Sequence, residues 1–166
     1  MQLSEHFSLA EAIDSSTAIR MGIDNIPTDE QISNMKIAAA GMEQIRTVLA
    51  HPINTNSWLR VEALEKILAN KDYISWCGIH KHTIDDASWD IYFARKGHPK
   101  GFAIDFTCPA FGTPAEIVAK LKDSGIKFDQ LLMEGTWVHV SFDPQMRNQV
   151  EVVTFVNDTP SYTKVS

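Results

Sequence analysis

Two histidines and one aspartate have the residue types of a catalytic zinc site. His98 and Asp105 lie close together in the chain, and His139 follows further on. A catalytic zinc binds three protein ligands of this kind and keeps a fourth coordination position for water. A single polar residue of this type on a strand is usually satisfied by ordinary hydrogen bonds. The three residues together predict a metal centre that activates water.

Asp105 lies in a segment that alternates like a half-buried strand. In residues 102–106, Asp105 and Ala103 share the face opposite Phe102, Ile104 and Phe106. A carboxylate on an otherwise apolar strand needs a partner to offset its desolvation, and a cation is such a partner. His98 precedes this strand in a short loop, from which its ring can reach Asp105.

The last ligand, His139, lies in a predicted β-hairpin. Two apolar runs within residues 128–142 flank Gly135-Thr136, a pair suited to a tight two-residue turn. In this register Leu132 lies opposite His139, and Glu134 emerges on the same face as the histidine. A carboxylate and an imidazole therefore converge on one place.

The ligand motifs resemble those of the zinc D-Ala-D-Ala carboxypeptidase family of peptidoglycan peptidases, which includes many phage endolysins and tail-associated enzymes. They read His98-x-x-Gly101-x-Ala103-x-Asp105 and Trp137-x-His139. The resemblance extends over most of residues 3–143. It implies an α+β fold in which a small, mainly antiparallel sheet carries the zinc and is backed by helices.

The same resemblance implies a substrate-binding arginine. The family commonly has Ser-Gly-Tyr-Arg at the position of Ser57 to Arg60, so Ser57 and Arg60 match while Trp58-Leu59 depart from it. A planar guanidinium suits a carboxylate or a polarised carbonyl. The resemblance therefore assigns substrate binding to Ser57 and Arg60, and a share of the oxyanion charge to Arg60.

Glu134 is the predicted general base, which would later give its proton to the leaving amine. In several relatives the catalytic acid lies three positions before the last histidine, where this chain has Thr136. A substrate-contacting role for Glu134 therefore stays open. Trp137 is expected to pack against His139 and to line the substrate site. Two nearby carboxylates, Asp129 and Asp143, are interpreted as residues at strand ends.

The implied activity is cleavage of a peptide bond in the peptidoglycan stem peptide, with one Zn²⁺ per chain. The sequence does not choose between a carboxypeptidase and an endopeptidase. Two alternatives remain. One is a non-catalytic phage structural or cell-wall-binding module that retains a metal site, and the other is a zinc amidohydrolase acting on another small peptide.

Composition limits the class of protein. The 166 residues fit one domain, and a hydrophobic content of 44% with 22% charged residues is typical of a globular chain. The net charge of −6 argues against a nucleic-acid partner. No apolar run has transmembrane length, and the first residues lack signal-peptide features. We therefore expect a monomer made in the cytoplasm, and the family resemblance implies that it acts on the cell wall after release or as part of a phage particle.

The chain is expected to form one domain over residues 1–157, which the resemblance makes a metallopeptidase domain, and a loose tail over 158–166. Capping boxes begin helices after Ser8 and Thr113, and a longer helix begins after Pro27 and stops before His51-Pro52. A further helix is expected to turn its apolar residues inward, namely Val61, Leu64, Ile67 and Leu68. Residues 150–155 are interpreted as an edge strand.

Residues 70–97 are interpreted as an insertion that rims the cleft. This segment offers a rival metal site from His80, His82, Asp85 and Asp86. At Lys96 the family commonly has serine, which changes the surroundings of the first ligand. Cys77 and Cys108 are interpreted as passive thiols because no neighbouring base or positive group can be identified for either.

Overall fold

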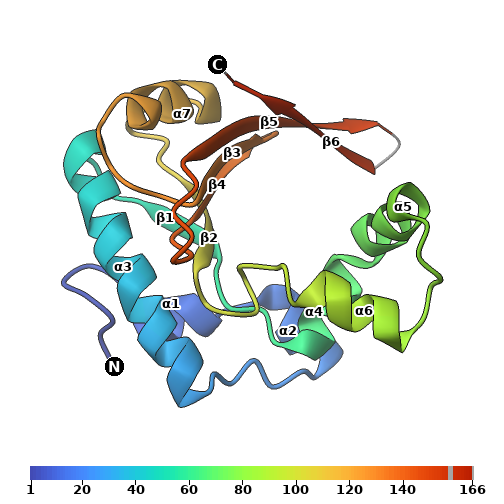
Figure 1. Cartoon of the computed structure of the whole chain (residues 1–166). Helices are drawn as coiled ribbons and strands as arrows, with labels where there is room; N and C mark the ends of the chain where they lie inside the picture. Colours follow the sequence, from blue (N-terminus) through green and yellow to red (C-terminus); the bar gives the residue numbers. More distant parts are fainter. Residues whose placement is uncertain (157–158, 166) are drawn as a thin grey trace.

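One mixed sheet organises the computed structural model, which describes residues 1–156 and 159–165 (Figure 1). Its strand order is β1-β2-β4-β3-β5-β6, and every neighbouring pair is antiparallel except β3 and β5. The strands are β1 (Asn54–Ser57), β2 (Ala103–Thr107), β3 (Gln130–Glu134), β4 (Trp137–Ser141), β5 (Gln149–Val156) and β6 (Thr159–Lys164). This arrangement confirms the α+β class and the largely antiparallel sheet.

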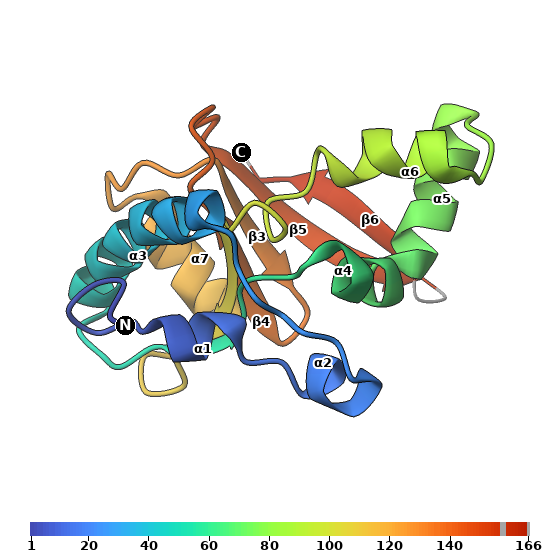
Figure 2. The ribbon, with the colours of Figure 1, turned by 90° about the horizontal axis from the view of Figure 1, so that it is seen from below.

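Helices cover both faces of the sheet (Figure 2). They are α1 (Leu9–Ile13), α2 (Ser16–Met21), α3 (Asp29–Leu49), α4 (Glu62–Leu68), α5 (Asn70–His80), α6 (Asp86–Phe93) and α7 (Pro114–Lys122). The long helix α3 lies with α7 against one face, while α4, α5 and α6 lie on the other side. None of these helices combines the length and apolar character needed to cross a bilayer, within the part of the chain that the structure describes.

The predicted helix starts are present. Ser8 and Thr113 each form a capping box with the glutamate three residues on, so orphan amides at each helix start are satisfied. Thr28 does the same for α3 with Gln31. That helix ends at Leu49, where Ala50 adopts a left-handed conformation before His51-Pro52.

The main core lies between the sheet and the pair α3 and α7. Met35, Met42 and Ile45 of α3 are almost fully buried, and Ile117 and Leu121 of α7 join them. Burying a side chain of this size stabilises the fold by about 1.5–3 kcal/mol. The sheet contributes the side chains of one face, namely Ile104, Phe106, Leu131, Val138 and Val140. Residues on the opposite face of β2, β3 and β4 are therefore left for a site.

Three strand predictions require correction. Residues 102–106 are buried on both faces, because the chain segments after β1 and before β2 cover the Asp105 side as well. The strand expected at residues 150–155 is not at the edge, since β5 pairs with both β3 and β6. The expected loose tail contains β6, which is held by the backbone ladder to β5. Residues 157, 158 and 166 lie outside the described residues.

Residues 70–97 form α5 and α6, which have a small core of their own. Tyr73, Cys77, Trp89 and Tyr92 are buried together there. The Tyr73 hydroxyl donates to the Asp85 carbonyl at 2.8 Å and ties the two helices to each other. Helix α5 lies next to β6 (Figure 1). Whether this segment is an insertion stays a prediction.

Candidate metal centre

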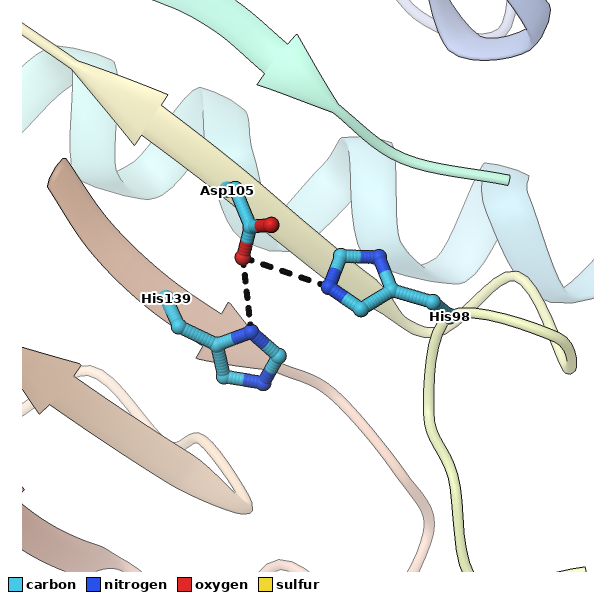
Figure 3. Close-up of side chains that lie close together, drawn as sticks. All are labelled: His98, Asp105 and His139. Atoms are coloured by element: carbon cyan, nitrogen blue, oxygen red, sulfur yellow. Dashed lines mark hydrogen bonds and ion pairs between the residues drawn. The ribbon is translucent and has the colours of Figure 1, made fainter. Parts of the chain in front are cut away.

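The three predicted ligands converge on the face of the sheet that lies away from the main core (Figure 3). Asp105 on β2 is the register partner of His139 on β4, and their Oδ1 and Nδ1 atoms lie 2.8 Å apart. His98 comes from the loop before β2, and its Nε2 lies 3.2 Å from the same Oδ1. One ligand atom from each residue fits within 4.8 Å of the other two. Among the described residues, no other His, Cys, Asp and Glu group does this.

The hairpin register is as predicted. Leu132 pairs with His139 and Glu134 pairs with Trp137, so Glu134 and His139 are diagonal neighbours on one face. The backbone decides this relationship, because a slip of one residue would turn the histidine into the core. Asp105 and His139 are therefore fixed by strand pairing and share this face with Glu134.

His98 is oriented by a backbone group. Its Nδ1 lies 2.7 Å from the carbonyl oxygen of Trp58, and a carbonyl only accepts, so Nδ1 carries the proton. The Nε2 atom is then the ligand atom, and it points at Asp105. A metal-binding histidine commonly uses its other nitrogen in this way, which fixes the tautomer and the ring.

The loop that carries His98 is tied down on both sides. Trp58 is 1% exposed, and its Nε1 donates to the Gly101 carbonyl at 2.9 Å. From α3, the side-chain amide of Gln31 donates to the Pro99 carbonyl at 2.7 Å. The side-chain amide of Asn34 donates to the Lys100 carbonyl at 3.0 Å. The ligand loop is thereby held between the long helix and the chain after β1.

The three ligands titrate in different directions. Burial by itself raises the pKa of Asp105, but the effects of His98, Arg60 and His139 lower it by more than burial raises it. The pKa of Asp105 therefore lies well below its usual range. Burial and then the charge of Arg60 lower the pKa of His98. For His139, burial lowers the pKa, but the hydrogen bond and charge of Asp105 raise it more. These directions favour an anionic Asp105 and a neutral His98.

This electrostatic pattern fits a bound cation. A neutral His98 with its proton on Nδ1 directs the Nε2 lone pair at an anionic oxygen 3.2 Å away. Two acceptors facing each other in a buried site are stabilised by a positive group near them; Arg60 supplies one at Oδ2 of Asp105, and a cation at the ligand atoms would supply another at Oδ1. Ligand atoms around a tetrahedral zinc lie about 3.3 Å apart, from bonds of roughly 2.0–2.1 Å. The distance from Asp105 to His98, 3.2 Å, is close to that value, whereas the distance from Asp105 to His139, 2.8 Å, is that of a hydrogen bond.

Arg60 is brought into the centre. Its Nη2 makes a short hydrogen bond to Oδ2 of Asp105, and its Nε donates to the Ser57 hydroxyl at 2.9 Å. The side chain is 18% exposed, so it is not a surface arginine. Ser57 therefore holds Arg60, and Arg60 satisfies the carboxylate oxygen that faces away from the histidines.

Glu134 and Trp137 lie together at the hairpin end. The Trp137 Nε1 donates to Oε2 of Glu134 at 3.0 Å, and both side chains are partly exposed. Burial lowers the pKa of His139, and Asp105 raises it by more. The charge of Glu134 adds a smaller contribution that also raises the pKa of His139. Trp137 thus restrains Glu134, whereas Thr136 lies exposed in the turn. Glu134 therefore shares the face of His139 and is restrained by Trp137, and its role as general base stays a prediction.

Other predicted candidates lie elsewhere. His82 stacks on Trp76 at a ring-centroid distance of 4.6 Å, and the His80 ring is tilted against the same tryptophan at 5.2 Å. The rival metal site of His80, His82, Asp85 and Asp86 is not formed. Lys96 pairs with Asp72 at 2.6 Å instead of approaching His98.

The remaining candidates have structural places. Cys77 is buried in the α5 and α6 cluster and Cys108 in the main core. Asp129 binds Arg147 through both carboxylate oxygens. Asp143 accepts a hydrogen bond from the Gln145 amide, as a residue at a strand end does.

Sequence reasoning missed two residues of the centre. Trp58 acts through its carbonyl oxygen, which no side-chain pattern reveals. Glu65 of α4 is 2% exposed and lies beside Arg60, whereas Ile67 and Leu68 are 42% and 45% exposed. The expectation that Ile67 and Leu68 face inward was wrong, because the buried side of this short helix contains Leu64 and Glu65.

Comparison with models of protein families and with curated proteins gives no match to this chain.

Proposed function

We propose that the chain is a zinc-dependent peptidase that cleaves a peptide bond in the peptidoglycan stem peptide. The observation that carries this proposal is the convergence of His98, Asp105 and His139 on one face of the sheet. Two neutral imidazoles and one carboxylate are a ligand set of catalytic zinc, in which one coordination position is kept for water. The metal, when bound, would lower the pKa of that water toward about 7 and polarise the scissile carbonyl.

The other residues of the centre have matching tasks. Glu134 would take a proton from the attacking water and return it to the leaving amine, since it shares the face of His139. Arg60 would hold the substrate or share the developing negative charge, because its guanidinium adjoins Asp105. Ser57 would keep the arginine in place through the Nε hydrogen bond. Trp137 would hold Glu134 and line the substrate site.

The substrate part of the proposal rests on the family resemblance of the ligand motifs and of Ser57 and Arg60. The ligand geometry by itself is equally compatible with a metalloamidase that acts on another small peptide. A non-catalytic module of a phage particle would keep the ligands without needing Glu134 beside them. Experiment must therefore distinguish the peptidoglycan peptidase from the amidase and from the non-catalytic module.

The test combines metal content with hydrolysis. We expect the purified protein to contain about one zinc per chain and to release new amino groups from purified peptidoglycan. Chelation should abolish the release, and added zinc should restore it. Zinc without action on peptidoglycan, but with hydrolysis of small peptide amides, would support the amidase. Absence of zinc binding would overturn the proposal.

A further inference from the structure

Glu65 is a buried carboxylate with an unmade hydrogen bond. Its side chain is 2% exposed, and its Oε2 has no hydrogen-bond partner among the described residues. Leaving such an oxygen desolvated is costly, so its charge must be compensated in another way. The cation beside it is Arg60, whose Nη1 lies 3.8 Å from Oε2.

Arg60 therefore lies between two carboxylates. On one side Nη2 is hydrogen-bonded to Asp105, and on the other side Nη1 faces Glu65 without a hydrogen bond. The Nε atom is held by Ser57 at 2.9 Å. A guanidinium fixed at Nε can turn about that contact, and a movement of about 1 Å would bring Nη1 into hydrogen-bond range of Glu65. The arginine therefore faces two carboxylates and is hydrogen-bonded to only one of them.

A bound metal would change how strongly Asp105 and Glu65 attract the Arg60 guanidinium. Asp105, Glu65 and Arg60 carry a net charge of −1, and a divalent cation at the ligands would change the total to +1. Such a cation takes electron density from Asp105 and repels the guanidinium, whereas the carboxylate of Glu65 keeps its full charge. The position of lowest energy for Arg60 then moves toward Glu65.

We propose that Glu65 is the positioning residue of Arg60. The Glu65 carboxylate accepts a hydrogen bond from the Arg60 guanidinium when a divalent metal occupies His98, Asp105 and His139. Glu65 lowers the electrostatic cost of binding the metal next to a buried arginine and keeps that arginine beside the site. This inference rests on the proposed metal centre, but it does not depend on which bond the protein cleaves.

Zinc affinity, measured by competition with a chelating dye, tests the inference without using activity. Glu65→Gln should weaken zinc binding about 10-fold, the lower end of the effect of residues that support metal ligands. Glu65→Asp keeps the charge but shortens the reach, and it should also weaken binding. Glu62→Gln is the matched control on the same helix, since Glu62 is half-exposed and pairs with Lys66 and Trp89. It should leave the affinity unchanged.

A double-mutant cycle separates positioning from simple charge. In an Arg60→Met background no guanidinium needs a second acceptor, so adding Glu65→Gln should change the affinity less than about threefold. An equal loss in both backgrounds would overturn the inference and leave the metal centre intact. Retained wild-type affinity in Glu65→Asp and Glu65→Gln, with both variants folded by circular dichroism, would overturn it as well. If the wild-type protein binds no zinc, the proposed function and this inference both fail.

Discussion

The carbonyl oxygen of Trp58 accepts a hydrogen bond from Nδ1 of His98 at 2.7 Å, and this contact determines which nitrogen the histidine offers to a metal. Trp58 follows β1, and His98 precedes β2, so the first ligand is aimed by a chain segment forty residues away. Asp105 and His139 need no such aid because they are paired directly across two strands. The centre thus combines two ligands set by the sheet with one set by a tied loop.

Removing His139 should remove the metal. His139→Ala takes away a ligand that no neighbouring side chain can replace, so zinc content should fall from about one per chain to near zero. Metal analysis after dialysis measures this, and peptidoglycan hydrolysis should be lost with it. His80→Ala is the matched control, because His80 is exposed and lies against Trp76. Equal zinc in wild type and His139→Ala would rule out the ligand set.

Removing the charge of Glu134 should separate chemistry from binding. Glu134→Gln keeps the size of the side chain but cannot take a proton, so the rate should fall about 100-fold to 10,000-fold while zinc content stays the same. Glu151→Gln provides a comparison, since Glu151 lies on the adjacent strand in register with Leu132. The glutamate would lose its role as base if Glu134→Gln retained the full rate.

Gly101 in the ligand loop should resist substitution. Its φ is +85°, and an added Cβ would lie 2.9 Å from the Gln31 carbonyl and from Met35 Cγ. Gly101→Ala should therefore cost about 2 kcal/mol of unfolding free energy and weaken zinc binding, because the His98 loop must shift. Urea unfolding and a zinc titration measure the two effects.

Gly78 supplies the control for that substitution. It lies within α5, and nothing would meet its Cβ within 4 Å. Gly78→Ala should stabilise the protein by about 0.5–1 kcal/mol, as expected for a helix interior, without changing zinc affinity. A loss of stability at Gly78 equal to that at Gly101 would contradict the explanation based on backbone strain and contact.

Asp129 should make the stability of the protein depend on pH. Burial raises the pKa of this carboxyl, but hydrogen bonds and the charge of Arg147 lower it by more than burial raises it. The pKa of Asp129 in the folded protein is therefore below its ordinary value. The stabilisation is therefore present above the unfolded pKa of about 3.9 and is lost as pH falls through the folded pKa. Asp129→Asn should cost about 2 kcal/mol at pH 7.

Unfolding measured between pH 7 and pH 3 checks this prediction. The difference between wild type and Asp129→Asn should be full at pH 7 and should shrink below about pH 4. Asp123→Asn, at an exposed position after α7, should stay within about 0.5 kcal/mol of wild type. A difference that does not change with pH would show that packing, and not the charge of Asp129, causes the loss.

Local patterns predicted several elements because their causes are local. The capping boxes at Ser8 and Thr113 involve residues three positions apart, and the turn at Gly135 fixes the register of its own hairpin. Alternation likewise placed Asp105 on the face opposite Ile104. These short-range rules identified His98, Asp105 and His139 and put Glu134 and His139 on one face.

Long-range packing decided what such patterns cannot express. The strand β6 was missed because its partner β5 supplies the hydrogen bonds that a polar tail lacks alone. In α4, spacing predicted Ile67 and Leu68 inside, but Glu65 is buried there because Arg60 lies next to it.

The sequence by itself determined the ligand types, their order and the strands that carry two of them, because residue chemistry and period-two alternation are written along the chain. Only the tertiary structure decided which atoms meet. The Trp58 carbonyl orients His98, Ser57 holds Arg60, and Arg60 lies between Asp105 and Glu65. The contacts of Trp58 with His98 and of Arg60 with Asp105 join segments 40 and 45 residues apart in sequence. Their strength comes from burial, which excludes the water that would otherwise compete for each charge and each hydrogen bond.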